Sequence, residues 1–206
     1  MTHGFRRTRH GVAAELGGPE RQVLVDLIRQ TEQLLAQDAP EEPAAPSQGE
    51  GDEFETLMRQ AGFGPGTGTA EDIPVTPPAP ADPAVRRLLP DAHREDAHAA
   101  GEFRRLAGDA VRDRKRAHLR RAAEAVESAG SERVRLAEEE AVSLLIALTD
   151  VRLVLGSRLG LDDDESAEGL SDRLADMDQE DPLFSLALGY EFLTWLQETL
   201  AVALTP

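Results

Sequence analysis

Aliphatic residues dominate positions 138–160, EEEAVSLLIALTDVRLVLGSRLG, although Asp150, Arg152 and Arg158 stand among them. The segment is too charged to cross a bilayer and too apolar to be a helix with one wet face. It therefore predicts a buried helix of roughly 35 Å, at about 1.5 Å per residue. Glutamates open the segment and Arg158 and Gly160 close it, which suits the helix dipole and supplies a stop.

A second apolar helix is predicted over residues 182–204, PLFSLALGYEFLTWLQETLAVAL, with Asp181 as its N-cap and Pro182 as its first residue. The two helices carry more large apolar side chains than one helix pair can bury, so other helices or a second subunit must cover the remainder. Gly156 predicts a backbone passing close by, because glycine costs up to about 1 kcal/mol relative to alanine inside a helix.

Weaker patterns predict the smaller elements. Residues 5–16 alternate and break at Gly11, which indicates a strand or hairpin, and residues 133–136 indicate a short strand. Further helices are predicted between Gly18 and Pro40, over about 97–128, and around Leu170 to Met177.

These elements predict a mainly α fold, a helical bundle around the two long apolar helices with a small N-terminal β element. We divide the chain into residues 1–38 (β element and helix), 39–82 (a Pro/Gly-rich mobile linker that contains a short helix at 52–63) and 83–206 (helical core).

The composition excludes several chemistries. The chain has no cysteine, which excludes disulfides, thiolate catalysis, zinc–cysteine sites and a thiol redox switch within it. A formal net charge of −17 opposes non-specific binding of nucleic acid, so any contact with DNA has to be local. No segment reads as a signal peptide or a membrane span, and we expect a cytoplasmic protein with no membrane contact.

A local basic stripe departs from this acidic background. Residues 103–121 carry a local net charge of +6, whereas residues 162–181 carry −9. The stripe can meet nucleic-acid phosphates or an acidic protein, although a solvated face partly neutralised by the acidic segment is the commoner outcome. Its arginines are Arg105, Arg112, Arg116 and Arg120.

Charged and aromatic residues within the apolar helices are further candidates. Asp150, Arg152 and Arg158 predict a buried ion-pair network, with Glu191 or Glu198 as partners, rather than a ligand site, because an unpaired buried charge is costly.

Tyr190 and Trp195 read as core or interface anchors rather than a platform for stacking bases. Apolar residues surround most of the circumference of residues 183–204, which suggests a homodimer with Tyr190 and Trp195 in its interface.

No catalytic signature is present in the sequence. His93, Glu95, Asp96 and His98 lie close together but at no known metal-ligand spacing. The acidic run at 162–169 places Ala167 where a calcium loop needs glycine, and the glycines of 62–69 lack the lysine of a phosphate loop. We therefore expect no enzymatic activity, no metal and no cofactor.

Four blocks resemble an actinobacterial family: RRLLPDAHRED at 86–96, GEFRRLAGDAVRDRK at 101–115, LIALTDVRLVLGSRLG at 145–160 and YEFLTWLQETLAVAL at 190–204. That family was first described only as a domain of unknown function and is sometimes named after the oxidative-stress transcriptional regulator AosR. The resemblance covers most of residues 5–204. It implies a small cytoplasmic protein that acts on transcription under oxidative or nitrosative stress. Without cysteine, sensing must lie in a partner or be absent.

The expected function is therefore a stress-linked transcriptional regulator. It would work through contacts with the transcription machinery or a sigma factor, with direct DNA contact through the basic stripe. The alternative is an adaptor or scaffold linked to protein turnover, for which an acidic helical surface with mobile linkers is equally suitable.

Overall fold

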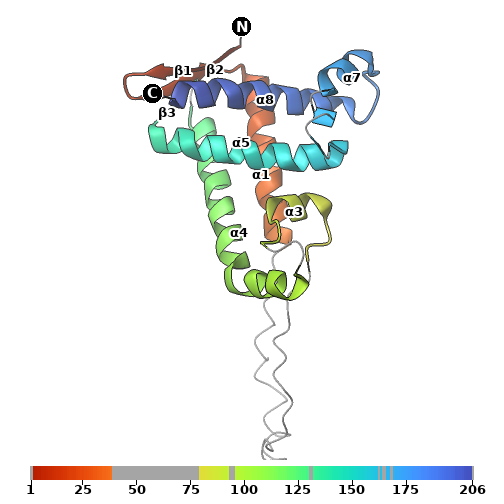
Figure 1. Cartoon of the computed structure of the whole chain (residues 1–206). Helices are drawn as coiled ribbons and strands as arrows, with labels where there is room; N and C mark the ends of the chain where they lie inside the picture. The colour runs from red at the N-terminus through yellow and green to blue at the C-terminus, as the bar shows by residue number, and fades with distance from the viewer. Residues whose placement is uncertain are drawn as a thin grey trace, which may run out of the picture.

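The computed structural model describes residues 2–38, 79–92, 96–129, 132–161, 163, 166–167 and 169–205. Within these ranges the fold is mainly helical with one small antiparallel sheet, as the sequence predicts (Figure 1). The predicted short helix at 52–63 and nearly all of the predicted linker lie outside the described residues. None of the described helices is both long enough and apolar enough to cross a bilayer.

The sheet consists of β1 (His3–Thr8), β2 (Gly11–Glu15) and β3 (Arg133–Leu136) in the order β1-β2-β3, with both pairings antiparallel. The predicted hairpin is confirmed, and Gly11 ends its tight turn with a φ of 129°, which glycine adopts without strain. One face of the sheet packs on the core through Phe5, Val12, Ala14, Val134 and Leu136.

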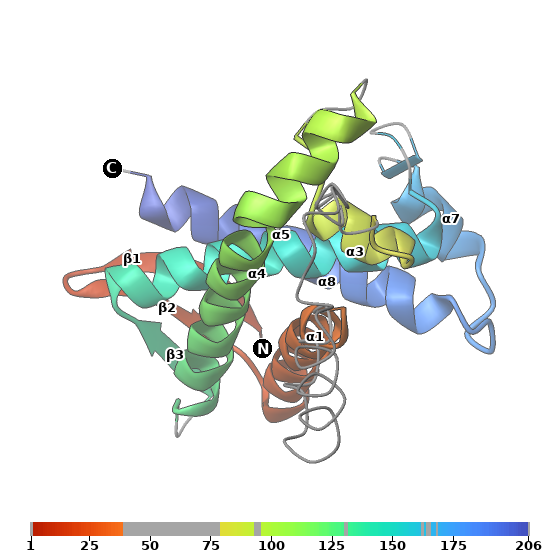
Figure 2. The ribbon, with the colours of Figure 1, turned by 90° about the horizontal axis from the view of Figure 1, so that it is seen from below.

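The central helix α5 (Glu138–Leu159) lies beside α8 (Phe184–Leu204), and α5 also packs on α1 (Gly18–Gln37) and α4 (Ala97–Glu127), as Figures 1 and 2 show. The shorter helix α3 (Pro83–Leu88) also packs on α5, and α7 (Leu170–Asp176) packs on α8. One apolar core joins the N-terminal elements to the later helices.

The predicted ends of α5 are confirmed. The Glu140 carboxylate accepts a hydrogen bond from the Ala137 backbone N–H at 2.8 Å, which satisfies one of the free donors at the helix start. Gly160 ends the helix in the left-handed conformation with a φ of 68°.

The prediction of a backbone beside Gly156 is wrong. A Cβ at this position would lie 3.6 Å from both the Arg87 guanidinium and the Tyr190 ring, so side chains fill the space. Arg87 also donates a hydrogen bond to the Leu161 carbonyl at 2.7 Å, which ties α3 to the end of α5. Both distances are ordinary van der Waals contacts, so a methyl group would also fit at this position.

The predicted start of α8 is wrong by two residues. The Asp181 carboxylate accepts from the Leu183 N–H at 2.8 Å and the Asp181 carbonyl accepts from the Phe184 N–H at 2.9 Å. These bonds form a turn around Pro182, and the helix begins at Phe184.

Only the second half of α4 is covered by another long helix. Its apolar residues Leu119, Ala122 and Val126 are fully buried. In the first half Phe103 is exposed and Leu106 is 70% exposed, because α1 ends at Gln37 and Asp38 already lies level with Arg112. The first half of α4 thus presents an apolar surface.

Candidate functional site

The predicted arginine stripe on α4 lies mostly against α1. Arg112 is buried, and its guanidinium donates to the Asp109 carboxylate at 2.8 Å and to both the carboxylate and the carbonyl of Asp38 at 3.2 Å. Arg105, by contrast, is exposed, and its ion-pair contact among the described residues is a loose one with Glu102 at 3.9 Å.

Glu32 of α1 binds the other two arginines of the stripe. Its carboxylate accepts from Arg116 at 2.8 Å and from Arg120 at 3.0 Å. Burial on its own would raise the pKa of Glu32, but the two hydrogen bonds outweigh burial and hold the pKa below its usual value. Glu32 therefore stays charged and compensates both cations.

The acids that neutralise the stripe differ from those suggested by the sequence. Among the described residues they are Glu32 and Asp38 at the end of α1 and Asp109 of α4 itself. The sequence holds no signal for this pairing, because the long segment between the two helices leaves their mutual orientation open.

The structure does not bring Asp150, Arg152 and Arg158 together. Arg152 donates to Gln197 at 2.7 Å and to the Tyr190 hydroxyl at 3.1 Å, between α5 and α8. Glu191 accepts from Ser171 instead of pairing with an arginine of α5.

At the other end of α5, Arg158 holds both carboxylate oxygens of Asp82, at 3.0 and 2.6 Å. The hydrogen bond from Arg158 lowers the pKa of Asp82 most, and the bond from the Ala84 N–H also lowers it. Asp82 is the N-cap of α3, so this ion pair holds the start of α3 against the end of α5.

Asp150 lies instead in a polar cluster between α4 and α5. It accepts a hydrogen bond from the Lys115 ammonium at 2.5 Å, and its second oxygen has no partner in the described part of the chain. Burial raises the pKa of Asp150, and the charges of Lys115 and His118 only partly oppose this.

Ser143 lies near His118 in the same cluster, with 3.3 Å between its Oγ and the imidazole Nδ1. The Ser143 hydroxyl is buried and donates to the Glu139 carbonyl at 3.0 Å. A hydroxyl engaged in this way and shielded from solvent is unsuited to act as a nucleophile, although serine, histidine and aspartate lie in the same region. The geometry supports a role in joining the two helices.

A hollow of about 440 Å³ lies beside the apolar surface of α4, between α3 and α4. Its walls include Phe103, Val111 and Leu153, and Arg87, Arg104 and Lys115 border it. A hollow with apolar walls can receive an apolar side chain of a partner. Of its bordering cations, Arg104 pairs with Asp91 and Lys115 pairs with Asp150 within the chain.

The aromatic residues of α8 differ in their surroundings. Tyr190 is buried, and its hydroxyl is held by Arg152 within the chain. Trp195 is 37% exposed and lies with Leu188 and Val202 at intervals of seven residues, which puts all three on one side of the helix. Leu188, Trp195 and Val202 are called the α8 stripe below.

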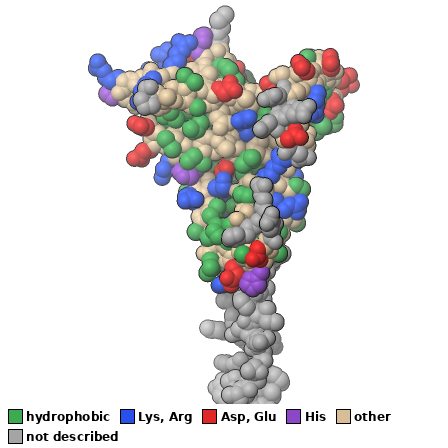
Figure 3. Space-filling view, in the orientation of Figure 1, with side chains coloured by type: hydrophobic (Ala, Val, Ile, Leu, Met, Phe, Trp, Pro, Cys, Tyr) green, Lys and Arg blue, Asp and Glu red, His purple; other side chains and the backbone are tan. Residues whose placement is uncertain are grey.

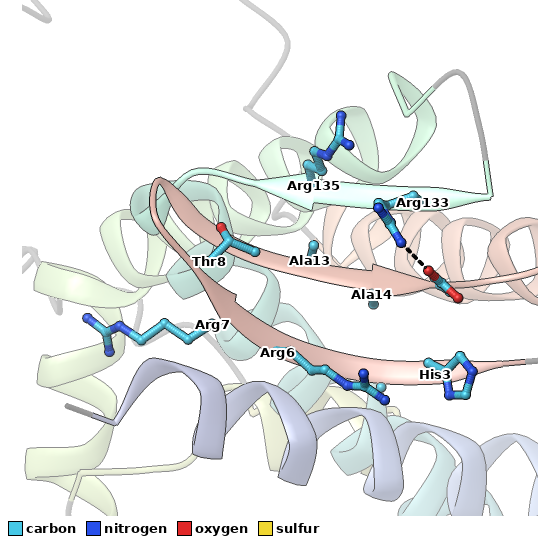
Figure 4. A pocket seen from close by; sticks show the side chains of 10 residues that line it. His3, Arg6, Arg7, Thr8, Ala13, Ala14, Arg133 and Arg135 are labelled. Atoms are coloured by element: carbon cyan, nitrogen blue, oxygen red, sulfur yellow. Dashed lines mark hydrogen bonds and ion pairs between the residues drawn. The ribbon is translucent and has the colours of Figure 1, made fainter.

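The outer face of the sheet carries a basic surface that the sequence analysis did not identify. Arg6 of β1 and Arg135 of β3 stand in one row on either side of Ala13, above a hollow of about 390 Å³ (Figure 4). The alternation of RVRL at 133–136 could have indicated outward-pointing arginines.

The remaining sequence candidates have a structural role or lie outside the described residues. Asp96 caps α4, because its carboxylate accepts from the N–H groups of His98 and Ala99 at 2.9 and 3.0 Å. His93 and Glu95 lie outside the described residues.

Comparison with curated proteins and with solved structures finds no match to this chain. The profile of one protein family, described as a domain of unknown function (DUF2017), matches residues 2–204. This match spans every described helix and strand, and it includes the sheet, the polar cluster and both apolar surfaces. The chain therefore belongs to the DUF2017 family.

Proposed function

We propose that this chain is a non-enzymatic, cytoplasmic protein that regulates transcription under oxidative stress through contacts with the transcription machinery or a sigma factor. The four sequence blocks that resemble the AosR-type proteins support this role. Since the chain contains no cysteine, thiol sensing lies in a partner or is absent.

The exposed apolar surface at the start of α4 is the observation that carries the proposal. Protein interfaces depend on a few apolar or aromatic anchors surrounded by polar groups. Phe103 and Leu106 are exposed next to the hollow between α3 and α4, and Arg105 lies on the same stretch of helix. The partner surface should therefore combine an apolar anchor with acidic side chains.

Direct contact between DNA and the basic stripe on α4 remains a prediction. Three of its four arginines already bind acids within the chain, which reduces the charge that they offer to phosphates. Arg105 is the most available of the four, since its contact with Glu102 is long and exposed. This difference favours contact with a protein at the start of α4.

The test is an affinity pull-down of the tagged full chain from its own cell extract, with and without nuclease and at two salt concentrations. Recovery of RNA polymerase or a sigma factor that survives nuclease supports the proposal. The variant Leu106→Glu should lose this partner. Val142→Glu, the same kind of change at an exposed position of α5, should keep it. Recovery of proteolytic machinery would favour the adaptor alternative, and recovery of neither would reject the proposed function.

A second copy of the chain is the proposed occupant of the α8 stripe. In an antiparallel pair Leu188 lies opposite Val202, and Trp195 lies opposite its own equivalent on the two-fold axis. The arrangement also brings Arg7, which binds the carbonyls at the end of α8, towards Asp178 and the acidic residues that precede α8 in the other copy. Charge complementarity therefore favours the antiparallel form.

The oligomeric state tests this part of the proposal. The wild type should sediment as a dimer and Trp195→Glu as a monomer, while Val142→Glu should remain dimeric. Trp195 is the only tryptophan, so its fluorescence should shift to shorter wavelength as the dimer forms with increasing concentration. A monomer at every accessible concentration would refute the dimer.

A further inference from the structure

Two arginines far apart in the sequence share one row on the outer face of the sheet. Arg6 pairs with Ala13, and Ala13 pairs with Arg135, so a methyl group separates the two long side chains. With strands about 4.8 Å apart, the backbones of Arg6 and Arg135 lie about 10 Å from each other. Figure 4 shows the two arginines on either side of Ala13, which forms the floor of the hollow.

The neighbouring row contains the one acid among the described residues that line this hollow. Glu15 pairs with Arg133 across the sheet, and its carboxylate accepts a hydrogen bond from the Arg133 guanidinium (Figure 4). This bond is the largest influence on the pKa of Glu15, which lies below its usual value. Arg6 and Arg135 have no ion-pair partner among the described residues, although the charge of Arg6 also acts on Glu15 from a distance.

Among the described residues, one group of acids lies away from this face, whereas Glu138, Glu139 and Glu140 closely follow β3. The acidic stretch around α7 lies at the opposite end of α8 from the hairpin (Figure 1). Figure 3 shows Lys and Arg side chains at the hairpin end and a group of Asp and Glu side chains at the α7 end. The molecule can therefore approach a polyanion with its basic end in spite of its net charge of −17.

The chemistry of the hollow distinguishes between classes of ligand. Its lining consists of arginine, histidine, threonine, alanine, glycine and one glutamate, without a large apolar side chain. A protein partner would need an apolar or aromatic anchor here, whereas a phosphodiester chain needs only cations and hydrogen-bond donors. Arginine can donate two parallel hydrogen bonds to one phosphate.

We propose that the outer face of the sheet binds the phosphate backbone of double-stranded DNA, with Arg6 and Arg135 as its principal contacts. This inference rests on the proposed role in transcription. The DNA would bind to the sheet, however, and not to the start of α4. Contacts to phosphates carry no base readout, so the binding is independent of sequence and strongly dependent on salt.

The test is fluorescence anisotropy of a labelled duplex of about 25 base pairs and arbitrary sequence, titrated with the full chain from about 50 mM salt upwards. Compared with the wild type, Arg6→Ala/Arg135→Ala should bind at least about tenfold more weakly. Its slope of log affinity against log salt should fall by about two, since each phosphate contact contributes about 0.9.

The matched control is Arg114→Ala/Arg121→Ala, which removes the same charge from exposed positions of α4 that belong to neither proposed surface. It should retain most of the affinity of the wild type. Glu15→Gln should bind several-fold more tightly, because it removes the negative charge among the described residues that line the hollow. This gain cannot come from unfolding, and circular dichroism melts check that every variant is folded.

Absence of duplex binding by the wild type at low salt would overturn the inference. Equal losses of affinity in the two double variants would also overturn it, because net charge alone would then explain the binding. The proposed function fails separately. If Arg6→Ala/Arg135→Ala still recovers nuclease-resistant polymerase or sigma factor, the protein contact stands whether or not the sheet binds DNA.

Discussion

Lys115 reaches Asp150 with only 2.5 Å between its Nζ and the carboxylate Oδ1, yet the two groups differ in their access to water. The Asp150 side chain is 2% exposed, whereas that of Lys115 is 23% exposed. The lysine can therefore be solvated without its partner, but the aspartate cannot. The cost of losing one partner should depend on which one is lost.

This asymmetry gives the first prediction. Lys115→Met should lower the free energy of unfolding by about 3 kcal/mol at pH 7, because it leaves a buried carboxylate unpaired. Asp150→Asn should cost only about 1 kcal/mol, because Lys115 can turn to solvent. Urea denaturation of both variants measures the two losses. Equal losses would show that the pair contributes as a unit and that exposure does not matter.

The pH dependence of Lys115→Met provides a second readout of the same pair. The folded state raises the pKa of Asp150 above its unfolded value of about 3.9, so protonation of this group favours folding. This contribution is fully present below the unfolded pKa and is lost as pH rises through the folded pKa. The deficit of Lys115→Met relative to the wild type should therefore shrink as pH is lowered towards about 4.

The second prediction concerns Glu32. Glu32→Gln should destabilise the fold by about 1 to 2 kcal/mol at pH 7, because it releases Arg116 and Arg120. Since the folded state lowers the pKa of Glu32, its contribution is present above the unfolded value of about 4.3 and is lost as pH falls through the folded pKa. Thermal melts at several pH values should show the variant and the wild type converging in acid.

Glu124→Gln is the matched control for this substitution. Glu124 is exposed on α4, and its carboxylate makes no ion pair within the described residues. The control should stay within about 0.5 kcal/mol of the wild type at every pH. A loss equal to that of Glu32→Gln would attribute the effect to net charge and not to the pairing of α1 with α4.

Local patterns carried the parts of the fold that could be predicted. The ends of α5 follow from Glu140 and Gly160, and the hairpin follows from alternation interrupted at Gly11. Buried helices 138–159 and 184–204 needed only their apolar content, although the turn at Asp181 shortened the second one. Each of these signals lies within a few residues of the structure that it predicts.

The candidate sites depended on contacts between distant residues. Glu32 and Arg116 meet only once α1 and α4 are placed side by side, and no periodicity encodes that placement. Arg6 and Arg135 share a row only in the observed strand register, and a slip of one residue would turn one of them towards the core. The sequence could show which residues are charged but not which of them remain uncompensated.

The third prediction separates the two roles of Asp82. Asp82→Ser keeps a hydroxyl that can accept from the Ala84 N–H but loses the pair with Arg158. It should cost about 0.5 to 1 kcal/mol, as expected for a partly exposed bidentate pair. Asp82→Ala also loses the cap and should cost about 1 to 2 kcal/mol. Thermal melts measure both variants, and equal losses would mean that capping of α3 contributes nothing.

The last prediction tests the attachment of the hairpin to β3. Gly11 has a φ of 129°, and a Cβ added there would lie 2.1 Å from the Leu136 carbonyl oxygen, which belongs to the backbone of β3 and cannot move aside without breaking the sheet. Gly11→Ala should therefore cost more than about 2 kcal/mol in thermal or urea unfolding. Gly18→Ala, where a Cβ meets no atom within 4 Å, should be neutral. If both variants matched the wild type, β2 would not lie against β3, and the row that joins Arg6 to Arg135 would not exist.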